Sequence, residues 1–74
     1  MTKKYIILTD SDGNHFLKGW MTFDIFLSAV ASINGDNSWL DYLTEIFYED
    51  KSHSVADWVG DAKIEIRHHL SLGN

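Results

Sequence analysis

The step Asp12-Gly13, which lies between two runs of β-branched and aromatic residues, constrains the fold more than any other feature of the sequence. The runs cover residues 5–9 and 15–20. Asp-Gly suits a type I′ turn, because both central residues of that turn need a positive φ. We therefore expect a β-hairpin over about residues 4–20. The expected register pairs Thr9 with Phe16, Leu8 with Leu17, Ile7 with Lys18 and Tyr5 with Trp20.

The two faces of this hairpin differ in character. One face is rich in aromatic residues, among them Tyr5 and Trp20, and the other is aliphatic, with Ile6 and Leu8. The pattern alone leaves open which of the two faces is buried. An isolated hairpin is only marginally stable in water, so we expect it to pack against helices.

The segment after the hairpin predicts a helix over residues 23–33. Thr22 suits the N-cap position, and Asn34-Gly35 supplies a left-handed stop at the C-terminal end. Apolar residues recur at helical spacing, which indicates one buried face. The residues of that face are Phe23, Phe26, Leu27, Val30 and Ile33.

Two further helices are expected. The second covers residues 39–48 and opens with Ser38 and Asp41, which resemble a capping box. The third covers residues 55–70, where Gly60 inside the helix costs about 1 kcal/mol relative to alanine. Its expected buried face consists of Val55, Val59, Ala62, Ile66 and either Leu70 or His69.

These elements predict an α+β fold in which an N-terminal β-hairpin packs on a three-helix bundle, in the order ββααα. The chain of 74 residues is expected to form a single domain over 1–74. Aromatic residues make up 14% of the sequence, which favours a folded globule over a disordered segment.

Composition restricts the function classes. The chain has no cysteine, so disulfides, thiolate zinc sites and cysteine nucleophiles are excluded, and we expect a cytoplasmic location. No apolar run reaches the ~18–20 residues of a membrane helix, so no membrane association is expected. A formal net charge of −5 argues against direct binding to nucleic acid.

Neither a metal nor a catalytic motif is found. Asp10, Asp12 and Asn14 resemble a calcium loop in composition but lack its spacing, so we interpret them as turn residues. Glu65 with His68 and His69 supplies too few ligands for a metal site. We expect no catalytic, cofactor or metal site, and no enzymatic activity.

Surface residues therefore carry the functional hypothesis. We expect a small acidic, non-enzymatic module that binds a protein partner, with a homodimer as an alternative arrangement. The alternative function is an inhibitor of the kind encoded by phages, which mimics the charge of nucleic acid and occupies a basic groove of a host protein. The candidate binding residues are Trp39, Tyr42, Tyr48, Trp58, Asp41, Glu45, Glu49 and Asp50.

Residues 22–72 show a partial resemblance to a known family. Residues 22–27 read Thr-Phe-Asp-Ile-Phe-Leu, residues 46–52 place an aromatic pair before acids and a polar break, and Asp57-Trp58 precedes Ile64 and Leu70. This pattern resembles the YozE-type, SAM-like small helical domains of Gram-positive bacteria. The family's Phe-Pro-Lys after the acidic break is absent, and the hairpin has no counterpart in it. The resemblance implies a helical bundle without a known catalytic role.

Overall fold

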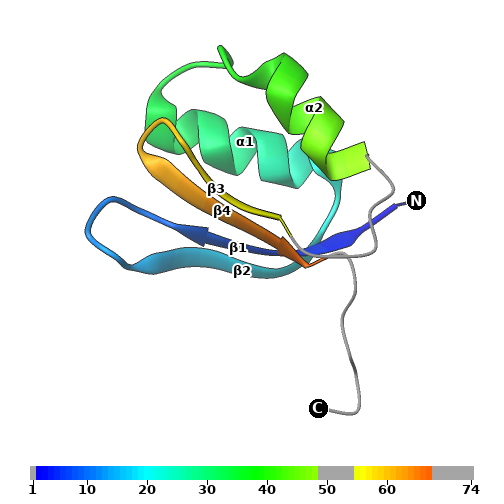
Figure 1. The fold of residues 1–74 in the computed structure, drawn as a ribbon, viewed down its shortest axis with the longest axis horizontal. Coiled ribbons are helices and arrows are strands. Elements are labelled where there is room, and N and C mark those ends of the chain that lie inside the picture. Colours follow the sequence, from blue (N-terminus) through cyan, green and yellow to red (C-terminus); the bar gives the residue numbers. More distant parts are fainter. Residues whose placement is uncertain (1, 49–54, 68–74) are drawn as a thin grey trace.

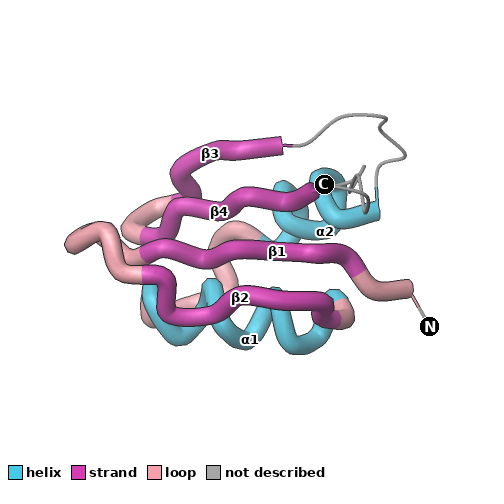
Figure 2. Tube along the Cα trace, turned by 90° about the horizontal axis from the view of Figure 1, so that it is seen from below, coloured by secondary structure: helices cyan, strands magenta, loops and turns pink. Residues whose placement is uncertain are grey.

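A computed structural model describes residues 2–48 and 55–67 of the chain, which form a four-stranded antiparallel sheet with two helices on one face (Figure 1). The sheet order is β2-β1-β4-β3, so two hairpins join along β1 and β4 and leave β2 and β3 at the edges (Figure 2). The elements are β1 (Lys4–Thr9), β2 (His15–Met21), α1 (Phe23–Asn34), α2 (Leu40–Tyr48), β3 (Val55–Val59) and β4 (Ala62–Arg67). In the described part of the chain, no helix is long and apolar enough to span a bilayer.

The N-terminal hairpin is confirmed, with one local difference. Tyr5, Ile7 and Leu8 have the expected partners on β2, but Thr9 faces His15, because the register shifts between Leu8 and Thr9. The predicted type I′ turn is wrong, since Gly13 has a φ of 88° and Asp12 does not have a positive φ.

Asp10 closes this turn. Its backbone carbonyl accepts the N–H of Gly13 at 3.0 Å. Its carboxylate oxygen Oδ1 accepts the N–H groups of Asp12 and Asn14, both at 2.9 Å. The Asp-Gly signal therefore located the turn correctly, while the aspartate two residues earlier sets its geometry.

The aliphatic face of the hairpin is the buried one. Ile6 and Leu8 are fully buried against the helices, whereas the Trp20 side chain is 55% exposed. The Tyr5 and Trp20 rings meet edge to face, with centroids 5.7 Å apart. The aromatic residues of the hairpin thus lie on the sheet face that carries no helix.

Helix α1 agrees with its prediction to within one residue. Thr22 occupies the N-cap position, although its side chain makes no capping hydrogen bond. Gly35 adopts the left-handed conformation at φ 80° and donates its N–H to the Ala31 carbonyl at 2.7 Å. Phe26 and Val30 from the predicted stripe are fully or almost fully buried.

Helix α2 begins at Leu40, one residue later than predicted. The expected capping box does not open it, because the Ser38 hydroxyl donates instead to Asp36 Oδ1 at 2.8 Å. Leu43 and Phe47 are buried, whereas Leu40 is 43% exposed.

The predicted third helix over residues 55–70 is wrong, and with it the three-helix bundle. Residues 55–59 and 62–67 form β3 and β4, and the part beyond Arg67 lies outside the described residues. In β4 the buried Ala62, Ile64 and Ile66 alternate with more exposed residues, which is the period of a strand. Gly60 has a φ of 62° and Asp61 does not have a positive φ, as in a type II′ two-residue hairpin turn.

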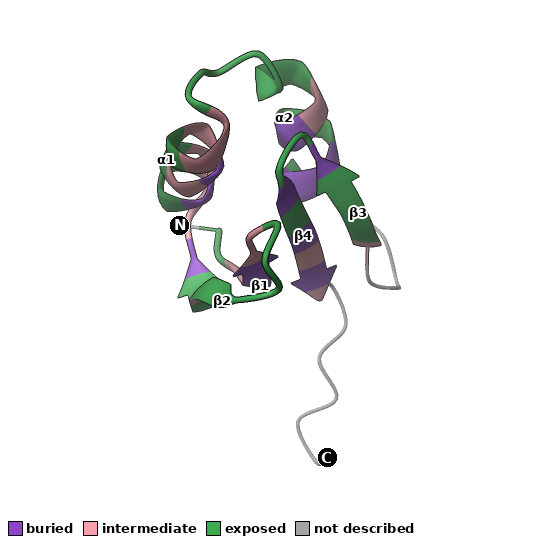
Figure 3. Cartoon of the chain, turned by 90° about the vertical axis from the view of Figure 1, so that its left-hand side faces the viewer, coloured by how far each residue is buried: buried purple, intermediate pink, exposed green. Residues whose placement is uncertain are grey.

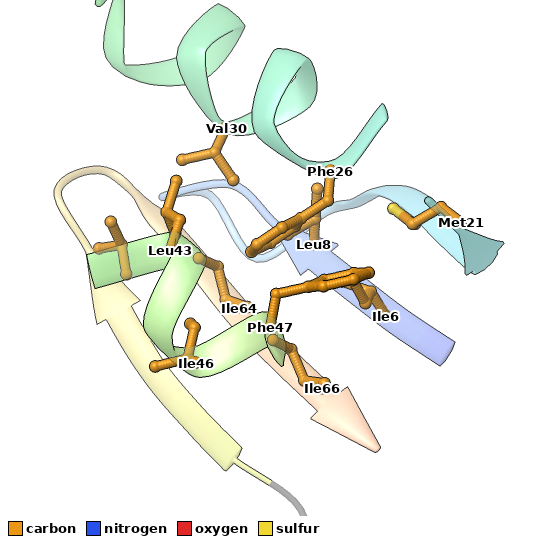
Figure 4. Packing of buried hydrophobic residues seen from close by; sticks show 11 residues of the cluster. Ile6, Leu8, Met21, Phe26, Val30, Leu43, Ile46, Phe47, Ile64 and Ile66 are labelled. Atoms are coloured by element: carbon orange, nitrogen blue, oxygen red, sulfur yellow. The ribbon is translucent and has the colours of Figure 1, made fainter. Parts of the chain in front are cut away.

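The core lies between the sheet and the two helices (Figures 3 and 4). At its centre the Phe26 and Phe47 rings stack with centroids 5.8 Å apart, and so join α1 to α2. Both phenylalanines are fully buried. The buried cluster consists of Ile6, Leu8, Met21, Phe26, Val30, Leu43, Ile46, Phe47, Val59, Ile64 and Ile66.

Candidate protein-binding surface

Charge is divided between the two layers of the fold. Residues 22–48, which contain both helices, include no Lys, Arg or His. They carry four exposed acids, Asp24, Asp36, Asp41 and Glu45. The helix layer therefore presents negative charge without any compensating cation of its own.

A hydrogen bond between side chains joins the helix layer to the edge of the sheet. The Tyr42 hydroxyl on α2 donates to Asp57 Oδ2 on β3 at 2.8 Å. Asp57 pairs with the buried Ile64, so its side chain lies on the face of the sheet that the helices cover. Its other oxygen, Oδ1, accepts the backbone N–H of Trp58 at 2.8 Å. This holds the carboxylate at the boundary between α2 and β3, which is an outer strand of the sheet among the described residues.

Aromatic and acidic side chains gather around this contact. The Trp39 ring lies 6.3 Å from the Tyr42 ring in an edge-to-face arrangement, and Trp39 is 38% exposed. Asp41 and Glu45 are exposed on α2 and stand four residues apart, which places them on one side of the helix. We call Trp39, Asp41, Tyr42, Glu45 and Asp57 together the α2–β3 surface.

The electrostatics of the α2–β3 surface show in the behaviour of Tyr42. The hydrogen bond to Asp57 raises the pKa of Tyr42 above its usual value of 10.0, and partial burial and the negative charges of Asp57 and Glu45 raise it further. The hydroxyl therefore keeps its proton, and its hydrogen bond to Asp57, to a more alkaline pH than an unperturbed tyrosine would. The negative charges of Asp57 and Glu45 both act on the Tyr42 hydroxyl, and the helix layer contains no cation to offset them.

The structure does not bring all the predicted site residues together. Trp58 is 51% exposed and pairs with Lys63, so it lies on the opposite face of the sheet from Asp57. Tyr48 is 55% exposed at the last turn of α2, where its ring packs against Phe23 at 5.3 Å. The remaining two predicted residues, Glu49 and Asp50, lie outside the described residues.

One member of the surface, Asp57, was missed as a binding residue. Asp57 falls within the segment that was predicted as the third helix, over residues 55–70. The signal in the sequence is the alternation of apolar and charged residues over residues 62–67, which is typical of a strand. With a turn at Gly60, that strand would have placed residues 55–59 on a neighbouring strand.

The opposite face of the sheet has a different charge. Lys18, Lys63, Glu65 and Arg67 lie on it, as their strand partners show. Arg67 Nη2 forms a salt bridge to Glu65 Oε2 at 2.9 Å. The sheet face therefore carries three cations and one acid among these four residues, whereas the helix layer carries acids without a cation.

The α2–β3 surface combines carboxylates with exposed aromatic rings. Among residues 2–48 and 55–67, no three His, Asp or Glu side chains come together as a metal site would need. Carboxylates next to exposed aromatic rings attract Lys and Arg side chains through charge and through cation–π contacts.

Comparisons of the chain with models of protein families, with curated proteins and with solved structures give no match. In the structure, the Asp57-Trp58 and Ile64 portions of the resemblance to the YozE-type family lie on β3 and β4.

Proposed function

We propose that this chain is a small, non-enzymatic protein-binding module that takes a basic surface of another protein onto its α2–β3 surface. The cysteine-free sequence suits a cytoplasmic site of action. The observation that carries the proposal is the hydrogen bond from Tyr42 to Asp57, because it brings acids and aromatic rings of a helix together with the edge strand of the sheet.

The physical basis of the proposal is complementarity. Exposed tryptophan and tyrosine rings supply apolar area at low entropic cost, and such residues dominate binding energy at protein interfaces. The acids of α2 and β3 add attraction for a basic partner and increase its association rate. A surface of this kind binds without any chemical step.

A second candidate is favoured by the absence of Lys, Arg and His from residues 22–48. An all-negative helix layer supports the alternative that the protein mimics nucleic-acid charge and occupies the basic groove of a host protein. This candidate uses a wider area than the α2–β3 surface, including Asp24 and Asp36. It predicts that short DNA duplexes compete with the chain for its partner.

Capture of partners from a cell lysate tests the proposal. Immobilised wild-type protein is compared with Trp39→Ala and with Glu45→Gln, and Trp20→Ala is the matched control because its tryptophan is exposed on the other face. We expect a captured protein to be lost with the first two variants, retained with the control, and released by high salt. Equal capture by all four proteins would reject the α2–β3 surface as the binding site.

A further inference from the structure

We infer that the partner contributes an extended segment of alternating basic and apolar residues, which adds to the sheet as an antiparallel strand along the edge of β3. This inference rests on the proposed function and specifies how the partner is bound. Strand addition to a sheet edge is an established mode of peptide recognition, in which backbone hydrogen bonds give affinity and alternate side chains give specificity.

The two edges of the sheet differ in how open they are to another strand. β2 carries Lys18, a register shift opposite Leu8 and Thr9, and Gly19 at a φ of 141°. Lysines and irregular pairing are features that protect an edge from further strands. β3 has no lysine, and it pairs with β4 in unbroken register from Val55 to Val59. Within the described residues, β3 is the regular edge.

The backbone groups that β3 offers follow from its turn. In a two-residue hairpin the residues flanking the turn, here Val59 and Ala62, form a hydrogen-bonded pair, and pairing then alternates along the strand. Asp57 therefore turns its backbone groups toward β4, while Ala56 and Trp58 turn theirs outward. The N–H of Trp58 agrees with this, because it donates to the side chain of Asp57 at 2.8 Å and not to β4.

An added strand changes the role of Asp57. A carbonyl of the incoming strand replaces Asp57 Oδ1 as acceptor of the Trp58 N–H. The released oxygen Oδ1 then accepts a hydrogen bond from a Lys or Arg side chain of the incoming strand. Oδ2 keeps its hydrogen bond from Tyr42. In the free protein the Trp58 N–H is satisfied by Asp57, and in the complex it is satisfied by the backbone of the partner.

The side chains on either side of β3 define the sequence of the incoming strand. On the helix-covered face, Asp57 and Glu45 favour Lys or Arg. On the other face, Trp58 is 51% exposed and stands beside Lys63, which disfavours a second cation there and favours an apolar side chain against the indole. The strand thus alternates basic and apolar residues, and Trp58 becomes part of the interface with the α2–β3 surface.

A synthetic peptide of alternating Lys and Val tests this geometry. In antiparallel pairing, the residues opposite Ala56 and Trp58 share their face of the sheet, so the valines turn their N–H and C=O groups toward β3. A peptide N-methylated at its valines should bind at least about tenfold more weakly than the unmethylated peptide. The matched peptide N-methylated at its lysines should bind as well as the unmethylated one.

Nuclear magnetic resonance of the full chain provides the readout. With the unmethylated peptide, the Ala56 and Trp58 amides should become protected from hydrogen exchange, and Trp58→Ala should weaken binding while Trp20→Ala leaves it unchanged. Three results would overturn strand addition. They are equal binding of the two methylated peptides, a loss of binding only with the lysine-methylated peptide, and no binding of the unmethylated peptide at low salt.

The proposed function is judged separately with the same unmethylated peptide. One outcome is that the double variant Asp57→Asn with Glu45→Gln binds the peptide more weakly, while both methylated peptides bind the wild type equally well. In that case charge alone holds the basic partner, so the strand inference is wrong and the proposed function is retained. If the unmethylated peptide binds the double variant as tightly as the wild type, the acidic surface does not recognise it, and the proposed function fails.

Discussion

Asn34, the last residue of α1, holds the β3–β4 turn so closely that a side chain on Gly60 would displace the Asn34 amide. The Asn34 amide donates from Nδ2 to the Val59 carbonyl at 3.0 Å and accepts the Asp61 N–H on Oδ1 at 2.8 Å. A Cβ atom on Gly60 would fall against the amide group of Asn34. This contact ties the C-terminal hairpin to a helix that precedes it by about two dozen residues.

Gly60→Ala should therefore destabilise the protein strongly. The left-handed φ of 62° alone costs an alanine about 1–2 kcal/mol, and displacement of the Asn34 amide adds to that cost. Chemical denaturation measures the change in unfolding free energy. Gly13→Ala is the control, because Gly13 also has a positive φ but has open space around the added Cβ. Equal losses in the two variants would show that the contact with Asn34 is unimportant.

Asn34→Ala should lower the unfolding free energy by about 1–3 kcal/mol, because it leaves the Val59 carbonyl and the Asp61 N–H without their side-chain partner. The exposed Asn37→Ala, in the connection between the helices, should change it by less than about 0.5 kcal/mol. Thermal or urea unfolding of both variants checks this prediction. A stability loss no larger in Asn34→Ala than in Asn37→Ala would contradict it.

Phe26→Ala or Phe47→Ala should each cost about 3–5 kcal/mol, which is close to the total stability expected for a domain of this size. Both rings are fully buried and stack on each other at the centre of the core. Ile25→Ala is the control, since Ile25 lies on α1 but is 52% exposed. Circular dichroism and urea titration report the outcome, and a well-folded Phe26→Ala or Phe47→Ala protein of unchanged stability would contradict this description of the core.

The stability of the protein should depend on Tyr42 at alkaline pH. The pKa of Tyr42 is raised in the folded state, mainly by its hydrogen bond to Asp57. The resulting stabilisation is complete below the unfolded value of about 10 and is lost as the pH rises through the folded pKa. Above pH 10, wild-type protein should lose more unfolding free energy than Tyr42→Phe.

The ring resonances of Tyr42 measure the same interaction directly. In Asp57→Asn the titration midpoint of Tyr42 should move down toward 10, because the charge and the charged acceptor are both removed. An unchanged midpoint in Asp57→Asn would show that Asp57 does not cause the shift.

Local signals made the N-terminal half of the fold predictable. The turn near Asp12-Gly13 and the end of α1 at Gly35 depend on residues next to them in sequence, so turn and capping preferences were sufficient. The loop detail at Asp10 was missed because an Asp side chain can satisfy backbone N–H groups in several turn types.

The C-terminal half was not predictable from helical periodicity. Val55, Val59, Ala62 and Ile66 fit a helix, yet Ala62, Ile64 and Ile66 fit a strand equally well. Pairing with β1 decides between them, because Ile66 lies opposite Ile6 and Ile64 opposite Leu8. These partners are far apart in sequence, and short-range patterns carry no information about them.

The residues of the candidate site also differ in how well the sequence predicted their positions. Asp41, Tyr42 and Glu45 share α2 and Trp39 directly precedes it, so spacing along the chain was enough to place these four residues near one another. Asp57 reaches them only through the sheet, and Trp58 was grouped with them although it lies on the other face. A strand places neighbouring residues on opposite faces, which a helix prediction does not anticipate.

The most direct test of the central claim is a titration of the isotope-labelled protein with oligolysine at low salt, followed residue by residue through its amide resonances. The account predicts that the largest shifts fall on residues 39–45 and on Asp57, and that they diminish as salt is added. Two results would contradict the claim that the α2–β3 surface binds a basic partner. One is that the largest shifts fall on β2, and the other is that the double variant Asp57→Asn with Glu45→Gln shows the same shifts as the wild type.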